Sequence, residues 1–245
     1  MKYLSFLSLF LFPLYVFGNA SAPGFWNAGG AEKFRLLFPK DKAAYQMLEM
    51  AKEQVSIDLY QGYAVVQGKY WMYNHSDQEL KLSIGYPINA DKDFWTDSHH
   101  RRVDVNLDSL YELEVWVEGE NVPNQLYQWN WHIWENEFKA KDTTLIVVRF
   151  IVNTNEARIT SGYRSDNTNC FVYLLESGAS WDFPIGKGEI RIRLNEVPFE
   201  SFRGVYPRNV FRTDSTSIFL YTFEEMIPNS EDNISLAYSE FLEDL

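Results

Sequence analysis

The sequence predicts an all-β protein, built as an antiparallel β-sandwich with one short N-terminal helix. Short stretches such as Val55 to Leu59 and Tyr111 to Val117 alternate apolar and polar residues. This two-residue period puts one face of a strand against a core and the other toward water. Aromatic residues make up 17% of the 245 residues, which is typical of strands. We expect about ten strands, forming one sandwich or two stacked sandwich halves.

Residues 1 to 20 are expected to be a secretory signal peptide. Lys2 precedes an apolar run from Tyr3 to Phe17, and Gly18, Asn19 and Ala20 supply small residues before a cut. We place the cleavage after Ala20, so that residues 21 to 245 form the β-sandwich domain. The alternative is a retained anchor, but the run is shorter than the roughly 20 apolar residues of a spanning helix. We therefore expect a protein exported to the periplasm or the medium, with no transmembrane segment after cleavage.

The net charge and the single cysteine further restrict the class of protein. The formal net charge is -12, and an acidic chain is a poor partner for nucleic acid. Cys170 is the single cysteine, so an intramolecular disulfide is excluded. An exported chain without disulfides fits a bacterial cell envelope, and we expect Cys170 to be a buried, inert thiol.

The first half of the chain is expected to hold one helix followed by five strands. Helix formers with apolar residues at helical spacing predict the helix from Ala43 to Lys52. Asn89 to Arg102 is interpreted as a polar loop, and turn residues at 119–125 mark the place for a boundary between two halves. The strands are expected at 55–59, 64–73, 80–86, 103–107 and 111–117.

The second half is expected to be all strands and loops. Thr143 to Val152 is almost continuously apolar, which predicts a central strand buried on both faces. Arg164 to Asn169 is interpreted as a turn, and Glu176 to Gly188 as a loop. Further strands are expected at 160–163, 171–175, 190–194, 216–223 and 234–238.

The aromatic segment from Gln125 to Lys141 provides one candidate binding site. Exposed aromatic rings stack on sugars or partner proteins at a low entropic cost. The alternative is that these rings pack between the sheets as part of the core. The candidate residues are Trp95, Tyr127, Trp129, Trp131 and Trp134.

Asp97, His99 and His100 provide a candidate metal site in the predicted polar loop. Imidazole and carboxylate groups suit a divalent ion. The alternative is a solvated loop, since adjacent histidines on a strand point to opposite faces. The chain has no phosphate-binding loop and no dinucleotide fingerprint, so we expect no cofactor, and we assign no catalytic residue.

Two groups of residues resemble the bacterial family known as "domain of unknown function 4424". The resemblance implies an exported, β-rich bacterial domain and supplies no activity and no catalytic residue. The first group is Gly29, Gly30, Met50, Glu53, Val55, Ile57, Val66, Tyr70, Asn74, Tyr86 and Pro87. The second group is Tyr173, Leu175, Gly178, Trp181, Ile185 and Gly186. The residues from Val55 to Pro87 also resemble, more weakly, a scaffold domain of inter-alpha-trypsin inhibitor chains.

The sequence thus favours a non-catalytic binding or interaction module of the bacterial cell envelope. Its partner would be a protein or another envelope component, with a glycan as a further option, and not a nucleic acid. Two alternatives stay open. One is a glycan-binding module or weak glycan-active enzyme that uses Trp129 to Trp134, and the other is a metal-dependent hydrolase at Asp97, His99 and His100.

Overall fold

The structure is a computed structural model of the chain. It describes residues 20–21, 24–26, 34–36, 38–87, 93–96, 102–105, 110–127, 131–155, 157–161, 163–207, 209–215 and 217–238. The predicted signal segment before Ala20 lies outside the described residues.

The largest unit is an eight-stranded sheet with the order β17-β18-β15-β3-β4-β12-β8-β9. Its strands pair antiparallel except that β15 runs parallel to β3. The strands are β3 (Leu48–Tyr60), β4 (Tyr63–Asn74), β8 (Leu110–Val117), β9 (Glu120–Val122), β12 (Thr143–Asn153), β15 (Ile185–Leu194), β17 (Arg212–Ser215) and β18 (Ile218–Met226).

Three smaller sheets and a few helical turns complete the described chain. A six-stranded sheet, ordered β16-β19-β14-β13-β7-β6, contains β6 (Asp93–Thr96), β7 (Arg102–Val105), β13 (Ala157–Ser161), β14 (Arg164–Tyr173), β16 (Phe202–Tyr206) and β19 (Ile234–Tyr238). A three-stranded sheet contains β10 (Gln125–Tyr127), β11 (Trp131–Phe138) and β5 (Leu80–Pro87), and a two-stranded sheet contains β1 (Gly24–Trp26) and β2 (Phe34–Leu36). The helical elements are η1 (Pro39–Asp41), α1 (Lys42–Tyr45), η2 (Leu175–Ser180), η3 (Phe199–Ser201) and η4 (Ser230–Asp232).

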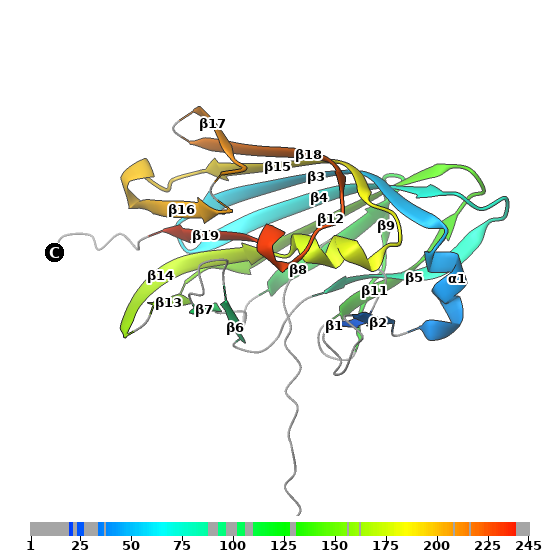
Figure 1. Ribbon diagram of the computed structural model, residues 1–245, viewed down its shortest axis with the longest axis horizontal. Coiled ribbons are helices and arrows are strands. Elements are labelled where there is room, and N and C mark those ends of the chain that lie inside the picture. The colour runs from blue at the N-terminus through cyan, green and yellow to red at the C-terminus, as the bar shows by residue number, and fades with distance from the viewer. Residues whose placement is uncertain are drawn as a thin grey trace, which may run out of the picture.

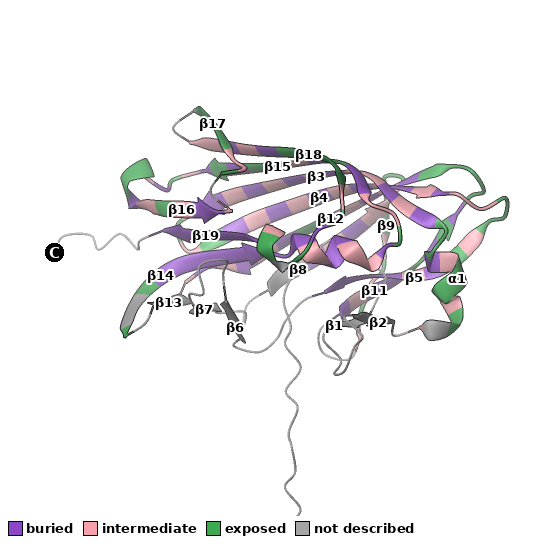
Figure 2. Cartoon of the chain, in the orientation of Figure 1, coloured by how far each residue is buried: buried purple, intermediate pink, exposed green. Residues whose placement is uncertain are grey.

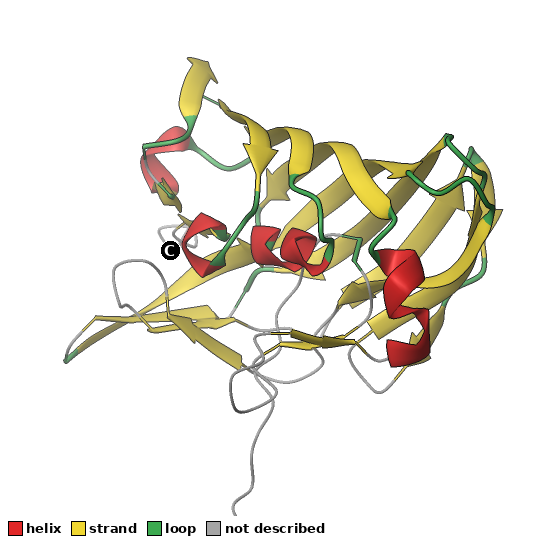
Figure 3. Cartoon of the chain, turned by 45° about the vertical axis from the view of Figure 1, so that its right-hand side comes forward, coloured by secondary structure: helices red, strands yellow, loops and turns green. Residues whose placement is uncertain are grey.

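The sheets form two layers around a shared core, as Figures 1 and 3 show. The eight-stranded sheet is one layer, and the six-stranded and three-stranded sheets lie across from it. Side chains join the layers directly. The Tyr238 hydroxyl of β19 donates a hydrogen bond to the Tyr60 carbonyl of β3, at 2.8 Å. The rings of Tyr86 on β5 and Phe150 on β12 have centroids 5.3 Å apart. The predicted all-β sandwich is therefore confirmed, and its predicted antiparallel pairing holds in the described sheets except between β15 and β3.

Strict alternation in the sequence produces this layering. Along β4 the even-numbered residues from Ala64 to Asn74 are buried, and the odd-numbered residues are exposed or half-buried. Figure 2 shows the same alternation along the other long strands of the sheet. Buried residues therefore line the face that looks toward the second layer, where their apolar side chains leave water.

The predicted helix is much shorter than expected. It covers Lys42–Tyr45, and the chain is already in β3 from Leu48 onward. The helix was expected because Ala44, Met47, Leu48 and Ala51 have helical spacing, but these residues do not share one buried face: Met47 is 43% exposed, and Leu48 and Ala51 lie on β3. A β-bulge between Met50 and Lys52 interrupts the two-residue alternation there, which would otherwise have indicated a strand.

Several other predictions from the second half and the loops are wrong in detail. Thr143–Asn153 is central in the sheet but alternates between buried and more exposed residues, so it is not buried on both faces. Arg164 to Asn169 is the first part of β14 and not a turn. The predicted polar loop contains β6 (Asp93–Thr96), and the described chain holds nineteen strands and not about ten.

The run from Val55 to Pro87 is divided between two layers. β3 and β4 are hydrogen-bonded neighbours, but β5 pairs with β11 in the three-stranded sheet. The chain also changes sheet at the predicted boundary, because β9 belongs to the large sheet and β10 to the small one. A division into two domains there stays a prediction.

Two further features of the described chain bear on its class. In this part of the protein, no helix is long and apolar enough to cross a membrane. Cys170 is buried on β14, where its side chain is 3% exposed.

Candidate functional site

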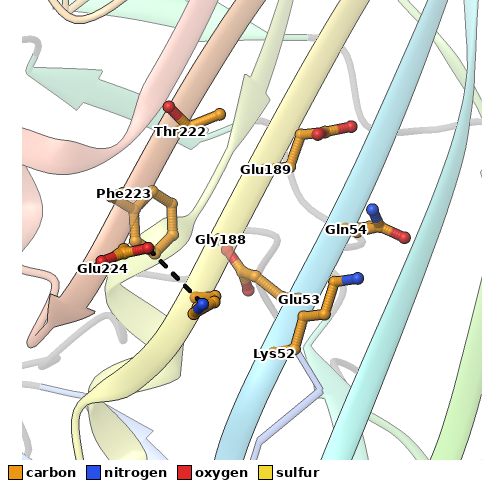
Figure 4. A pocket seen from close by; sticks show the side chains of 9 residues that line it. Lys52, Glu53, Gln54, Gly188, Glu189, Thr222, Phe223 and Glu224 are labelled. Carbon is orange, nitrogen blue, oxygen red and sulfur yellow. Dashed lines mark ion pairs between the residues drawn. The ribbon is translucent and has the colours of Figure 1, made fainter.

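A pocket of about 470 Å³ lies on the large sheet, where β3, β15 and β18 run side by side (Figure 4). Its position results from the pairing of β15 with both neighbours, parallel to β3 and antiparallel to β18. The lining residues are Lys52, Glu53, Gln54, Lys187, Gly188, Glu189, Thr222, Phe223 and Glu224.

Polar side chains line this pocket in two rows that cross the strands. In the first row, Glu224, Lys187 and Lys52 hold aligned positions on β18, β15 and β3. In the second row, Thr222, Glu189 and Gln54 are aligned in the same way. These residues alternate with the core-facing ones, so their side chains are on the outward face of the sheet.

The charges in the pocket are only loosely paired. Lys187 Nζ lies 3.8 Å from Glu224 Oε1, and both side chains are more than two-thirds exposed. Lys52 Nζ lies 4.6 Å from the centroid of the Trp71 ring, a cation–π contact. Exposed ion pairs of this kind contribute little to stability. The two lysine ammonium groups are therefore free to bind an anionic group brought from outside.

Directly behind the pocket is a buried polar cluster, the Glu53–tyrosine cluster, formed by Glu53, Tyr70, Tyr86 and Tyr173. All four side chains are fully buried. They come from β3, β4, β5 and β14, so the cluster joins the two layers of the fold. The hydroxyl oxygens of Tyr70 and Tyr173 share a hydrogen bond at 3.2 Å.

The electrostatics of this cluster favour neutral tyrosines. Burial raises the pKa of Tyr70, Tyr86 and Tyr173, and the nearby carboxylate of Glu53 raises each pKa further. Removal of water disfavours the charged phenolate, and a neighbouring negative charge disfavours it again. The tyrosine hydroxyls thus remain hydrogen-bond donors and acceptors through the physiological pH range.

Local sequence features place these buried groups. The bulge at β3 turns Glu53 inward and leaves Lys52 on the outward face. Gly186 lies beside the bulge, where an added Cβ would meet the Ala51 carbonyl oxygen at 2.5 Å. Gly68 leaves room for the Tyr70 side chain, since its Cβ would lie 2.0 Å from the Tyr70 hydroxyl. The bulge thus places Lys52 outside and Glu53 inside, and the two glycines leave space for the Ala51 carbonyl and the Tyr70 side chain.

Two of the aromatic binding residues predicted from the sequence are buried and form no exposed platform. Trp131 and Trp134 on β11 are each 2% exposed, which agrees with the alternative of core packing. At this exposure, neither ring offers a face on which a sugar could stack. Tyr127 is half-buried, with its ring centroid 5.9 Å from that of Phe38.

The remaining predicted residues lie partly or wholly outside the described part of the chain. Trp95 lies on β6, and the position of its side chain is not described. Trp129 and the candidate metal ligands Asp97, His99 and His100 lie outside the described residues. Within the described part of the chain, no three His, Cys, Asp or Glu residues come together as a metal site. The metal site stays a prediction.

Sequence reasoning did not find the pocket on the large sheet. The alternation from Glu189 to Leu194 indicated that Glu189 would be on a polar face, but Lys52 was expected at the end of the helix and Lys187 in a loop. Nothing in the local pattern showed that β15 would pair in parallel with a strand more than a hundred residues earlier. That pairing alone brings Lys52 and Lys187 together.

Comparison with known proteins shows the fold and little more. No protein-family model and no curated protein matches the chain. Among solved structures, the chain is similar to a "putative nutrient binding protein" from Legionella pneumophila, with a TM-score of 0.56 and 14% sequence identity. The match covers 80% of this chain and 68% of that one, so it shows a shared fold.

Two weaker likenesses are to peptidase-type enzymes. An M1 zinc metallopeptidase from Deinococcus radiodurans matches with a TM-score of 0.40 and 10% identity, over 78% of this chain and 42% of that one. Yeast LTA4 hydrolase matches with a TM-score of 0.41 and 13% identity, over 79% of this chain and 29% of that one. The chain thus spans less than half of either enzyme, and similarity at this level supports no conclusion about activity.

Proposed function

We propose that the protein is an exported, non-catalytic binding module of the bacterial cell envelope. Its ligand carries an anionic group that binds on the outward face of the large sheet, between Lys52 and Lys187. The alignment of these two lysines on neighbouring strands is the observation that carries the proposal.

Two like charges at aligned positions on paired strands repel each other. One carboxylate, Glu224, lies 3.8 Å from Lys187, while Lys52 faces the Trp71 ring. An incoming anion between the ammonium groups would relieve the repulsion and form charge-assisted hydrogen bonds. The pocket lining holds two lysines and three glutamates, so the favourable position for the anion is the space between the two ammonium groups and not the pocket as a whole.

The second row of the pocket gives the ligand its other contacts. Thr222, Glu189 and Gln54 offer a hydroxyl, a carboxylate and an amide next to the lysines. This mixture suits a polar ligand that combines an acidic group with hydroxyl or amine groups. A small solute or an acidic group on an envelope polymer would both meet these requirements. Binding rather than catalysis is proposed because these side chains are exposed or half-buried on an open sheet face.

Two findings agree with this proposal at a coarser level. The Legionella protein of the same fold is described as a "putative nutrient binding protein". In addition, no helix of the described chain could hold it in a membrane.

We also propose that the chain belongs to the family called "domain of unknown function 4424". Met50, Glu53, Tyr70 and Tyr173 are among the residues of the resemblance, and all are fully buried at the junction of the layers. An experimental structure of a family member would test this proposal. We expect the equivalent glutamate and tyrosines to meet in the same way, and a different core at these positions would contradict it.

Calorimetric titration of the purified chain tests the proposed site. The probes are inorganic phosphate and succinate, with putrescine as a cationic control, at low ionic strength because salt screens such contacts. We expect saturable binding of at least one anion and none of putrescine. The double variant Lys52→Met/Lys187→Met should bind at least tenfold more weakly.

Lys69→Met is the matched control, because Lys69 is on the same outward face but does not line the pocket. It should bind like the wild type. Equal weakening by Lys69→Met would show a general charge effect, and no anion binding by the wild type would overturn the proposed site.

A further inference from the structure

Ala20 and Ser21, at the predicted end of the signal peptide, are part of the folded core. Both residues are 0% exposed, and Ala20 belongs to the main hydrophobic cluster. The first residues of a domain are usually poorly ordered unless specific contacts hold them. Their complete burial here shows that they contribute to the folded protein.

Specific hydrogen bonds hold both residues. The Ser21 amide donates to the Gly85 carbonyl at 2.9 Å, and the Gly85 amide donates back to the Ser21 carbonyl at 3.1 Å. Ser21 thus forms an isolated antiparallel bridge with Gly85 of β5. In addition, the buried indole of Trp181 donates its Nε1–H to the Ala20 carbonyl at 3.2 Å.

Ala20 also adjoins the Glu53–tyrosine cluster, because its backbone forms a hydrogen bond with Tyr70. A cut after Ala20 would take away the acceptor of Trp181 and empty a fully buried position. It would also place the new ammonium group of Ser21 at a site with no access to water. A buried donor without an acceptor and a buried charge are both costly.

We propose that the signal peptide is removed upstream of Ala20, at the bond between Gly18 and Asn19, so that Ala20 and Ser21 remain as a structural plug. Gly18 is the nearest small residue before Ala20, and a small residue is what signal cleavage requires at this position. The reaction is hydrolysis by the host's signal peptidase. One water is consumed, Gly18 acquires a carboxylate, and Asn19 becomes the N-terminal residue with an ammonium group.

This inference depends on the proposed export but not on the proposed ligand. Full-length protein is therefore expressed in a bacterial host and recovered from the envelope fraction or the medium. Its first residue is then determined by intact-mass measurement and N-terminal sequencing. We expect a chain that begins at Asn19 and retains Ala20. A folded chain that begins at Ser21 or later would overturn the inference, and so would a chain that retains Met1.

Hydrogen exchange at the tryptophan indoles gives an independent reading on the same exported protein. If Ala20 is retained, the Nε1 proton of Trp181 should be strongly protected by its bond to the Ala20 carbonyl. Trp181→Phe identifies its NMR resonance by loss. The matched control is Trp116→Phe, because Trp116 is half-buried on β8 and should exchange faster. Equally fast exchange at both indoles would contradict a retained Ala20.

Discussion

The two faces of the large sheet both carry polar or charged side chains and use them in opposite ways. On the outward face, Lys52 and Lys187 line an open pocket and make only loose contacts. On the inward face, Glu53, the residue after Lys52, is fully buried, and so is Tyr70 on β4. Charged groups in water can be exchanged at little cost, whereas buried ones must keep their partners.

We therefore expect the inward face to stabilise the fold and the outward face to bind the ligand. The Glu53–tyrosine cluster joins strands from both layers, so changes there should reduce the stability of the whole fold. The pocket on the other side contributes little to stability, so changes there should affect binding alone. Four predictions test this division, and they follow from the largest expected effect per residue to the smallest.

The largest effect is expected from removing the ring of Tyr70. Tyr70→Ala deletes a fully buried side chain and its hydrogen bond to Tyr173, and should lower the free energy of unfolding by about 3–5 kcal/mol. Tyr73→Ala is the matched control, because Tyr73 is on the outward face of the same strand, and it should cost less than about 1 kcal/mol. Urea denaturation measures both. Similar losses would contradict a special role for the inward face.

The second effect concerns the room that Gly68 leaves for Tyr70. Gly68→Ala places a Cβ 2.0 Å from the Tyr70 hydroxyl, and such overpacking typically costs about 1–3 kcal/mol. The cost should disappear when Tyr70 is already alanine. A double-mutant cycle measures this coupling, and additive losses would show that the contact with Tyr70 is not the cause.

The third effect is a loss of stability at alkaline pH. Burial raises the pKa of Tyr70, Tyr86 and Tyr173, and it raises the pKa of Tyr238 to about 12. An unfolded tyrosine ionises near pH 10. Below that pH both states keep their protons and stability is complete. Above it, only the unfolded state releases protons, so stability falls as pH rises toward the folded-state pKa.

The expected loss is about 1.4 kcal/mol at pH 11 for each tyrosine that stays protonated in the folded state. Denaturant titrations at pH 9 and pH 11 measure it. Tyr86→Phe and Tyr238→Phe should each reduce the loss of unfolding free energy at pH 11 by about 1.4 kcal/mol, the contribution of one tyrosine. An unchanged dependence in both variants would contradict the assignment.

The smallest effect is expected at the pocket itself. Lys52→Met/Lys187→Met should change the free energy of unfolding by no more than about 0.5 kcal/mol, because the pairing of Lys187 with Glu224 is exposed. The same urea titrations measure this. A loss comparable to that of Tyr70→Ala would show that the outward face also stabilises the fold.

Much of the fold could be predicted from alternation along the chain. The strands β4, β5, β8, β12, β18 and β19 were expected close to their observed positions, and the second halves of β3 and β15 were also expected. The predictions were wrong where a bulge interrupts the two-residue alternation or where polar residues hide it. The bulge beside Ala51 interrupts the alternation in the first half of β3, and the polar residues from Arg164 to Asn169 concealed the start of β14.

The candidate site could not be predicted in the same way, because it depends on pairings between distant parts of the chain. Lys52 and Lys187 are neighbours only through the parallel contact of β3 with β15. For Trp131 and Trp134, the sequence suggested a site that the structure does not form. Their sequence context allowed an exposed platform, but their burial is decided by the strands that surround β11.

The most direct test of the central claim is an NMR titration of the isotope-labelled protein with the anion that binds best in calorimetry. If the ligand binds at the proposed pocket, saturable amide shifts should centre on Lys52 to Gln54, Lys187 to Glu189 and Thr222 to Glu224. They should be lost in Lys52→Met/Lys187→Met, while the fold remains intact. Saturable shifts centred elsewhere, or shifts that persist in the double variant, would contradict the account.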